Sequence, residues 1–341
     1  MSTIAQCLFI STLIGGSLIS ISANSWFSAW MGLEINLLSF IPLMSDPKNP
    51  LSNEATLKYF LIQALASITF LFTTTFMQMY TYSSLPLVIN FFSMLIISTL
   101  LMKMGAAPFH FWFPGTMEGL NWKNCFILMT WQKIAPLVLL SYLVKMNLFT
   151  LLIIILSVII GSLGGLNQTS LRKLLAYSSI NHLGWMTAAM LCGENLWELY
   201  FLIYSLLTLT LIYVFSILSI FHFNQNFMII NDSQPLKLLL FLTLLSLGGL
   251  PPFLGFFPKW IVIQSLIALN SHFICFIMIL MTLITLFYYI RLSFTALLII
   301  YPQMKYKPTC MKSKTTLTVP TTLTSLSLLT LPLCTLIYNC L

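Results

Sequence analysis

The feature that most constrains this chain is a recurring apolar stretch of about 20 residues, the length that crosses the hydrocarbon of a bilayer as a helix. Eleven such stretches follow one another, separated by polar or proline-containing segments. Their approximate ranges are 3–22, 26–44, 57–80, 84–118, 123–146, 149–168, 173–191, 196–222, 236–270, 272–300 and 319–340. Backbone polar groups in hydrocarbon must be satisfied internally. The sequence therefore predicts an all-α, polytopic membrane protein with about 11 transmembrane helices.

The composition excludes several other classes of protein. Of the 341 residues, 59% are hydrophobic and 6% are charged, against roughly a quarter charged in an ordinary soluble domain. The net charge is +8, but no basic stretch carries interleaved aromatic residues, so we expect no nucleic-acid partner. The seven cysteines form no CxxC pair, and neither a GxGxxG motif nor an HExxH motif occurs. We therefore expect no metal, nucleotide, flavin or iron–sulfur site in this chain.

Two of the stretches, 84–118 and 236–270, are too long for one plain crossing, and each contains a Gly- and Pro-rich break. The first break reads GAAPFHFWFPG and follows Lys103, and the second reads GGLPPFLGFFPKW and ends at Trp260. A broken helix frees backbone groups that protein or water must satisfy. Such helices therefore usually line a buried polar cavity.

The two breaks fall in the fourth and the ninth stretch, which suggests a repeat of five. Because five is odd, the second unit enters the membrane from the opposite side. We therefore predict one membrane domain of two inverted five-helix repeats, each with a discontinuous helix, at residues 1–146 and 147–300, and a basic loop with a C-terminal helix at 301–341. The alternative is that two proline-rich helices coincide by chance.

Basic residues gather in the connections on the N-terminal side. They are Lys48, Lys58, Lys123, Arg172, Lys173, Lys237, Lys305, Lys307, Lys312 and Lys314. The positive-inside rule places these loops and the N-terminus in the cytoplasm or the mitochondrial matrix, with the C-terminus on the opposite side.

Among the ionisable residues within predicted spans, four are the main candidates for function: Glu34, Lys103, Lys133 and Lys259. Such a charge costs on the order of 2.5 to 3.5 kcal/mol near the bilayer centre and usually faces the interior of a bundle. Low dielectric disfavours the charged form of lysine, and a nearby carboxylate favours it, so these residues could bind and release protons. The alternatives are an ion pair that packs helices for Glu34 and snorkelling to the interface for the lysines.

Two histidines are candidate relays. His182 shares a helical face with Ser178, Asn181 and Trp185, which fits a proton relay and an interhelical hydrogen bond equally well. His110 lies in the first break, where it could be a relay or a backbone cap.

Several strings carry a family resemblance: AWMGLEINLLSF, KMGAAPFHFWFPG, LMTWQKIAP, LRKLLAYSSINHLGWM and GGLPPFLGFFPKW. They resemble the subunit 2 family of mitochondrial NADH:ubiquinone oxidoreductase (respiratory complex I), whose fold is similar to that of antiporter subunits. The resemblance implies an antiporter-like core subunit that translocates protons in the inner mitochondrial membrane, with the N-terminus in the matrix and the C-terminus in the intermembrane space.

The same resemblance implies roles and partners. Glu34 and Lys103 would be the coupled carboxylate and lysine of the first half, Lys133 the central lysine, and Lys259 the lysine of the second broken helix. Flavin, iron–sulfur clusters and quinone would belong to other subunits, so this chain would be part of an NADH:ubiquinone reductase without a redox site of its own. Its partners would be other membrane subunits and lipids.

Two other classes of function remain open from the residues alone. A free-standing cation/proton antiporter would use the same buried lysines. A purely structural membrane scaffold would use the charges as packing pairs, but it leaves unexplained why they gather beside helix breaks.

Overall fold

The computed structural model describes residues 3–80, 86–223, 225, 234–298, 322, 324 and 325. Every extended regular element among these residues is a helix, and the β structure there is limited to an isolated bridge between Ser170 and His222. The chain divides into two compact units, Met1–Ser157 and Val158–Leu341.

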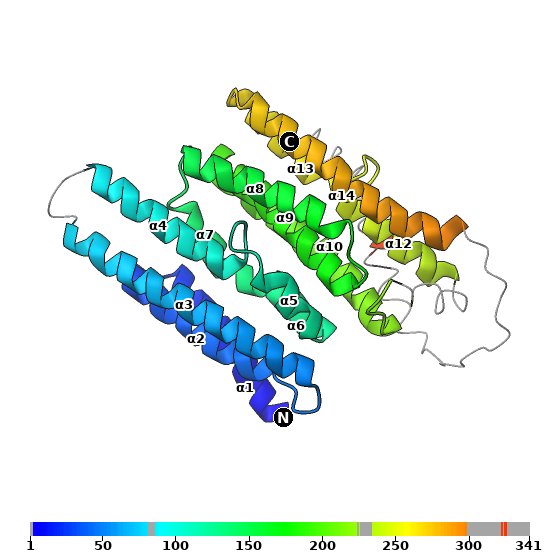
Figure 1. Cartoon of the computed structure of the whole chain (residues 1–341), viewed down its shortest axis with the longest axis horizontal. Coiled ribbons are helices and arrows are strands. Elements are labelled where there is room, and N and C mark those ends of the chain that lie inside the picture. The colour runs from blue at the N-terminus through cyan, green and yellow to red at the C-terminus, as the bar shows by residue number, and fades with distance from the viewer. Residues whose placement is uncertain are drawn as a thin grey trace. The chain divides into compact units, whose positions relative to one another are not determined.

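The first unit is a bundle of helices (Figure 1). Its helices are α1 (Thr3–Ile21), α2 (Trp26–Met44), α3 (Pro50–Tyr80), α4 (Pro86–Met104), α5 (Trp112–Gly119), α6 (Trp122–Met129) and α7 (Trp131–Ser141). Helix α3 contacts α2, α4 and α5, and α7 contacts α1, α4 and α6. Helices α4 and α5 are the two halves of the predicted discontinuous helix.

The second unit also contains a broken helix. Helix α8 (Leu148–Gly165) begins before the unit boundary, and the others are α9 (Leu171–Cys192), α10 (Glu194–Leu218), α12 (Gln234–Gly248), α13 (Phe256–Ala268) and α14 (His272–Leu298). Within this unit α13 contacts α9, α10 and α14 (Figure 1). Helices α12 and α13 are the halves of the second discontinuous helix.

Length and composition agree with a polytopic membrane protein. Seven spans in the described part of the chain are long and apolar enough to cross a bilayer: α1, α2, α3, α6 with α7, α8, α10 and α14. Helices α12 and α13 and residues 90–104 of α4 are shorter apolar pieces, as expected for halves of broken helices. The predicted eleventh span, 319–340, and the basic loop from Lys305 to Lys314 lie outside the described residues apart from 322, 324 and 325.

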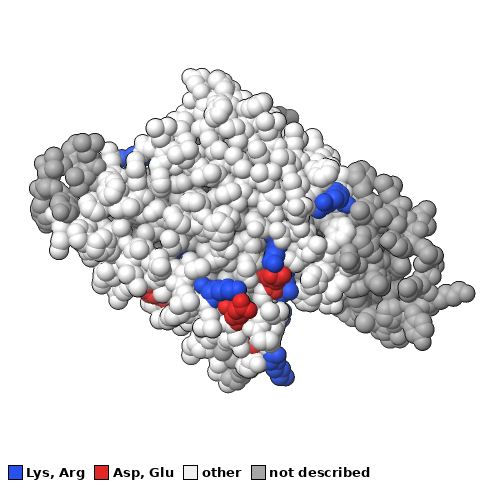
Figure 2. Space-filling model, viewed as in Figure 1, with Lys and Arg blue, Asp and Glu red and all other residues white. Residues whose placement is uncertain are grey.

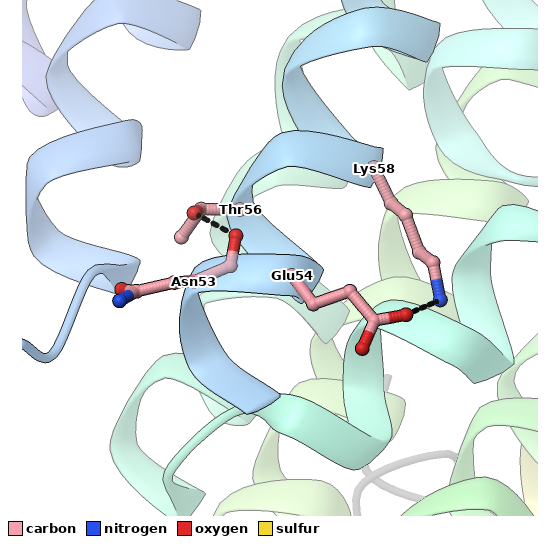
Figure 3. Close-up of polar contacts among 4 residues, drawn as sticks. All are labelled: Asn53, Glu54, Thr56 and Lys58. Atoms are coloured by element: carbon pink, nitrogen blue, oxygen red, sulfur yellow. Dashed lines mark hydrogen bonds and ion pairs between the residues drawn. The ribbon is translucent and has the colours of Figure 1, made fainter. Parts of the chain in front are cut away.

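The predicted start of the third span, at residue 57, was wrong. Helix α3 begins at Pro50 and has 31 residues, about 46 Å at 1.5 Å per residue. This exceeds the hydrocarbon thickness of about 30 Å, so polar turns at its start can reach water. Figure 3 shows two local contacts there: Thr56 Oγ1 donates to the Asn53 carbonyl at 2.7 Å, and the exposed Lys58 pairs with Glu54 at 2.5 Å.

The predicted span 123–146 corresponds to one candidate crossing, Trp122–Ser141, but its helix is not continuous. The helix is interrupted at Thr130, which separates α6 from α7, and α7 ends at Ser141. The backbone N–H and the hydroxyl of Thr130 both donate to the Phe126 carbonyl, at 3.0 and 2.7 Å. A threonine hydroxyl that bonds back to the preceding turn competes with regular helix geometry. Pro136, one turn further on, lacks an N–H and removes another helical bond.

Charged side chains are few on the surface of the described residues (Figure 2). On the face shown in Figure 2, the charged side chains form only a few small groups among uncharged atoms. Leu61, Leu65, Ile68 and Phe72 recur at helical spacing along α3, and each is more than half exposed. An apolar stripe of this kind suits hydrocarbon or another membrane subunit.

Candidate functional site

The first helix break begins with a specific C-terminal motif. Gly105 follows the end of α4 with φ of 72°, in the left-handed region that glycine adopts without steric cost. Its N–H donates to the Met102 carbonyl at 3.2 Å, and the Ala106 N–H donates to the Leu101 carbonyl at 3.1 Å. This pair of bonds is a Schellman motif, which ends a helix while satisfying its last carbonyls.

The second break begins with the same motif. Gly249 follows α12 with φ of 83°. Its N–H donates to the Ser246 carbonyl at 3.0 Å, and the Leu250 N–H lies 3.5 Å from the Leu245 carbonyl. The two units therefore stop their discontinuous helices with the same backbone device.

In the first unit, neutral side chains satisfy further carbonyls at the end of α4. Gln63 Nε2 donates to the Lys103 carbonyl at 3.1 Å, and Trp112 Nε1 donates to the Met102 carbonyl at 3.1 Å. His110 is buried in the break, where its Nδ1 lies 3.2 Å from the Pro108 carbonyl. This contact fits the interpretation of His110 as a backbone cap.

In the second unit, the functional candidate itself makes the corresponding contact. Lys259 lies in the first turn of α13 with 6% of its surface exposed, and its Nζ donates to the Gly248 carbonyl at 2.9 Å. A Cβ atom at position 249 would lie 2.9 Å from this Nζ. Glycine is therefore required there both for its backbone conformation and for the approach of the ammonium group. A cation at a helix C-terminus also opposes the helix dipole.

The other two candidate lysines lie over aromatic rings. Lys103, in the last turn of α4, is 7% exposed, with its Nζ 5.8 Å from the centre of the Phe70 ring. Lys133, in the first turn of α7, is 1% exposed, with its Nζ 5.0 Å from the centre of the Phe113 ring. A desolvated cation–π contact contributes about 2 kcal/mol. The sequence could not point to these two rings among 27 phenylalanines.

Glu34 is half-buried on α2 and does not touch the lysine expected to be its partner. Among the described residues, Glu34 and Lys103 form no ion pair within 4.0 Å. Any coupling between the carboxylate and the lysine therefore works through space in this conformation.

A polar network that the sequence did not reveal links three helices of the first unit. Gln132 Nε2 on α7 donates to Asn36 Oδ1 on α2 at 3.0 Å, and the Tyr59 hydroxyl on α3 lies 3.5 Å from Gln132 Oε1. Asn36 and Tyr59 are buried. Since Gln132 adjoins Lys133, the network fixes the helix that carries the central lysine. The only sequence feature that could have indicated it is a polar residue next to a buried lysine.

His182 lies at the centre of a buried aromatic group in the second unit. Its Nδ1 is 2.9 Å from the hydroxyl of Tyr200, and its ring centre is 5.0 Å from that of Tyr204. Both tyrosines are on α10 and nearly fully buried. The face predicted around His182 is buried as a whole, since Ser178, Asn181 and Trp185 are also inside.

The described residues contain no group of three or more His, Cys, Asp or Glu that could hold a metal ion. They do contain buried cationic side chains within apolar helices. Three ammonium groups are buried beside helix irregularities, two over aromatic rings and one on a backbone carbonyl.

This arrangement defines a class of polytopic membrane proteins that hold ionisable groups at broken helices within the bilayer. The chain belongs to the family described as NADH:quinone oxidoreductase/Mrp antiporter, transmembrane, which residues 23–285 match.

Curated relatives support the assignment over almost the whole chain. It is 57% identical over 302 residues to NADH-ubiquinone oxidoreductase chain 2 of Anopheles gambiae, with 88% of each chain covered. It is 53% identical over 339 residues to NADH-ubiquinone oxidoreductase chain 2 of Aedes aegypti, with 99% of each chain covered.

A solved structure shows the same fold. A chain of the respiratory complex I from Thermus thermophilus with bound Aureothin matches with a TM-score of 0.83 and 24% identity. The match covers 96% of this chain and 79% of that one. The structural neighbour is therefore a component of a multisubunit complex.

Proposed function

We propose that this chain is an antiporter-like, proton-translocating membrane subunit of respiratory complex I, which couples NADH:ubiquinone electron transfer to proton movement. One observation carries the proposal: Lys103, Lys133 and Lys259 are each 7% exposed or less, and each lies beside a helix irregularity. A buried charge that serves packing alone is commonly neutral or unfavourable for stability, whereas proton carriers require one.

The environment of each lysine supports reversible protonation. An aromatic ring face stabilises the ammonium group of Lys103 and of Lys133, and the neutral ring leaves no charge behind when the proton is lost. The Gly248 carbonyl stabilises the ammonium group of Lys259 in the same way. In the proposal Glu34 shifts the proton affinity of Lys103 through space, Lys133 connects the halves, and His182 relays protons in the second unit. His110 is assigned to the backbone of the break.

The names of the relatives and their animal sources support a mitochondrial location for this function. We propose a multi-pass protein of the inner membrane whose partners are the other membrane subunits of the complex and lipids, with flavin, iron–sulfur clusters and quinone held elsewhere. The N-terminus would face the matrix and the C-terminus the intermembrane space. Thiol labelling of single cysteines placed at Lys48 and Glu194 in mitoplasts tests this orientation, since label from the intermembrane side should reach only position 194.

The deciding experiment is Lys133→Met in the intact complex, reconstituted into sealed vesicles. Methionine keeps an apolar stem of similar length, so assembly should persist while NADH-driven acidification falls at least tenfold. The matched control is Lys58→Met, at an exposed lysine in the same unit. A fully assembled Lys133→Met complex with normal proton pumping would remove the central lysine from the pathway.

A free-standing cation/proton antiporter is the competing function, because the matching family also includes Mrp antiporters. Purification of the chain under mild conditions separates the two. Co-purification with an NADH-oxidising assembly is expected, and cation/proton exchange by the isolated chain would instead support the antiporter.

A further inference from the structure

A small cavity borders the second helix break and reaches His182. It has a volume of about 10 Å³, which is near the lower limit for one water molecule. Its lining comes from four elements: α9, α10, α12 and the segment that opens α13. The lining residues that matter here are His182, Tyr200, Tyr204, Gly255 and Pro258.

The polar side of this cavity is built by a histidine and a phenol in contact. The Tyr200 hydroxyl lies 2.9 Å from His182 Nδ1, and Tyr200 is 1% exposed. A buried phenol usually needs a hydrogen-bond partner, and here the partner is the titratable ring nitrogen. The opposite wall contains Pro258, the residue directly before Lys259.

We infer that Tyr200 is a proton-transfer residue of the second unit, which passes protons between His182 and one water molecule held in this cavity beside the Lys259 break. The inference rests on the proposed function. It adds a phenol to a set of residues that otherwise consists of amines, a carboxylate and an imidazole.

The transfer balances without a charged phenol. The phenolic proton of Tyr200 moves to His182 Nδ1 while the phenolic oxygen takes a proton from the water in the cavity. The ammonium group of Lys259 returns a proton to the water and becomes a neutral amine, while His182 becomes an imidazolium and Tyr200 is neutral again. One proton has then moved from Lys259 to His182. Exchange of the histidine tautomer and rotation of the hydroxyl reset the relay.

The other titratable groups around His182 come from three elements. Tyr204 on α10 has its ring 5.0 Å away, Lys259 stands at the break, and Tyr289 on α14 lies within electrostatic range of Tyr204. Among these, the Tyr200 hydroxyl is the group at 2.9 Å from His182 Nδ1. Tyr200 is therefore the group placed to exchange a proton with His182.

The test uses Tyr200→Phe in the assembled complex in sealed vesicles. The substitution removes one oxygen and keeps the ring, so we expect assembly but at least a fivefold loss of pumped protons and of coupled turnover. The matched control is Tyr213→Phe, which removes a part-exposed hydroxyl from the same helix outside the cavity and should change neither quantity.

The double variant tests whether Tyr200 acts through His182. If Tyr200 and His182 act in one relay, Tyr200→Phe with His182→Gln should pump no worse than the poorer single variant. Multiplicative losses in the double variant, or normal pumping by assembled Tyr200→Phe, would overturn the inference.

A second variant covers failure of the first to assemble. Ile203→Phe fills the cavity and keeps both polar side chains, and it should give the same loss. Normal pumping by Ile203→Phe, or failure of both variants to assemble, counts against the relay. Lys133→Met and Lys259→Met in the same assay distinguish failure of the proposed function from failure of the Tyr200 relay. Normal pumping by both lysine variants overturns the proposed function. Loss of pumping in the lysine variants together with normal pumping by Tyr200→Phe overturns only the relay.

Discussion

The two helix breaks share one backbone design and differ in the side chains that complete it. Both discontinuous helices end in a Schellman motif at a glycine with positive φ, Gly105 in the first unit and Gly249 in the second. In the first unit Gln63 and Trp112 satisfy further carbonyls of the ended helix, so Lys103 is not needed for that purpose. In the second unit the ammonium group of Lys259 does it. With the same backbone geometry, the buried lysine can itself cap the last carbonyls of the helix, or other side chains can cap them.

The surroundings of the breaks also differ. The first unit has the half-buried carboxylate Glu34 on α2 and an amide network around Gln132. In the described part of the second unit, the carboxylates Glu194 and Glu198 lie in the first two turns of α10, and the deep polar contact is His182 with Tyr200. Buried side-chain hydrogen bonds link helices in both units, between amides in the first unit and between a histidine and a phenol in the second.

The largest effect that separates the units is expected from Lys259→Met. The variant removes a proton carrier and leaves the buried Gly248 carbonyl without its donor, so proton pumping should fall at least tenfold and stability by about 1 to 3 kcal/mol. The counterpart Lys103→Met should lose pumping to a similar extent with a smaller loss of stability, because Gln63 and Trp112 still complete the break. Proton pumping and the thermal midpoint of the assembled complex measure the two quantities.

Equal thermal midpoints for Lys259→Met and Lys103→Met would show that the Lys259 contact does not stabilise the break. The different side chains at the two breaks would then have no different effect on stability.

A smaller effect is expected from the double-mutant cycle of Glu34→Gln and Lys103→Met. Beyond 4 Å, at an effective dielectric of about 20, the two charges interact by less than about 4 kcal/mol. Each single variant should lower pumping several-fold, and the double variant should cost less than the sum, because neither charge then lacks its partner's field. Strictly additive losses in fully assembled complex would mean that Glu34 acts on another group.

The smallest effect is expected from Gln63→Leu, which removes a neutral cap in the first unit. The lost hydrogen bond and the carbonyl left behind should reduce stability by about 1 kcal/mol, with proton pumping retained. Gln78→Leu, at an exposed position of the same helix, is the control and should leave the thermal midpoint unchanged. A Gln63→Leu complex that is stable but does not pump would show that the cap and the proton pathway are as closely joined in the first unit as in the second.

The membrane class, the two helix breaks and the four ionisable side chains could be predicted from the sequence. The length of an apolar stretch, its lack of charge and its glycine and proline residues are local properties of the chain. In a bilayer these properties determine where helices cross and where they break, because unpaired backbone groups are very unfavourable in hydrocarbon. The long polar start of α3 and the interruption at Thr130 were missed, because a helix can continue into water and because threonine breaks a helix only where its hydroxyl bonds back.

The partners of the buried groups were decided by the tertiary structure alone. Which two phenylalanine rings lie under Lys103 and Lys133, and which tyrosine faces His182, depends on residues that are far apart in the chain and meet only when the helices pack. The sequence determined where the charges lie along the chain. The packing of the helices determined that Lys259 touches a backbone carbonyl, whereas Lys103 lies over a ring and does not touch Glu34. The reason is that side-chain contacts between helices depend on helix rotation and register, and not on spacing within one helix.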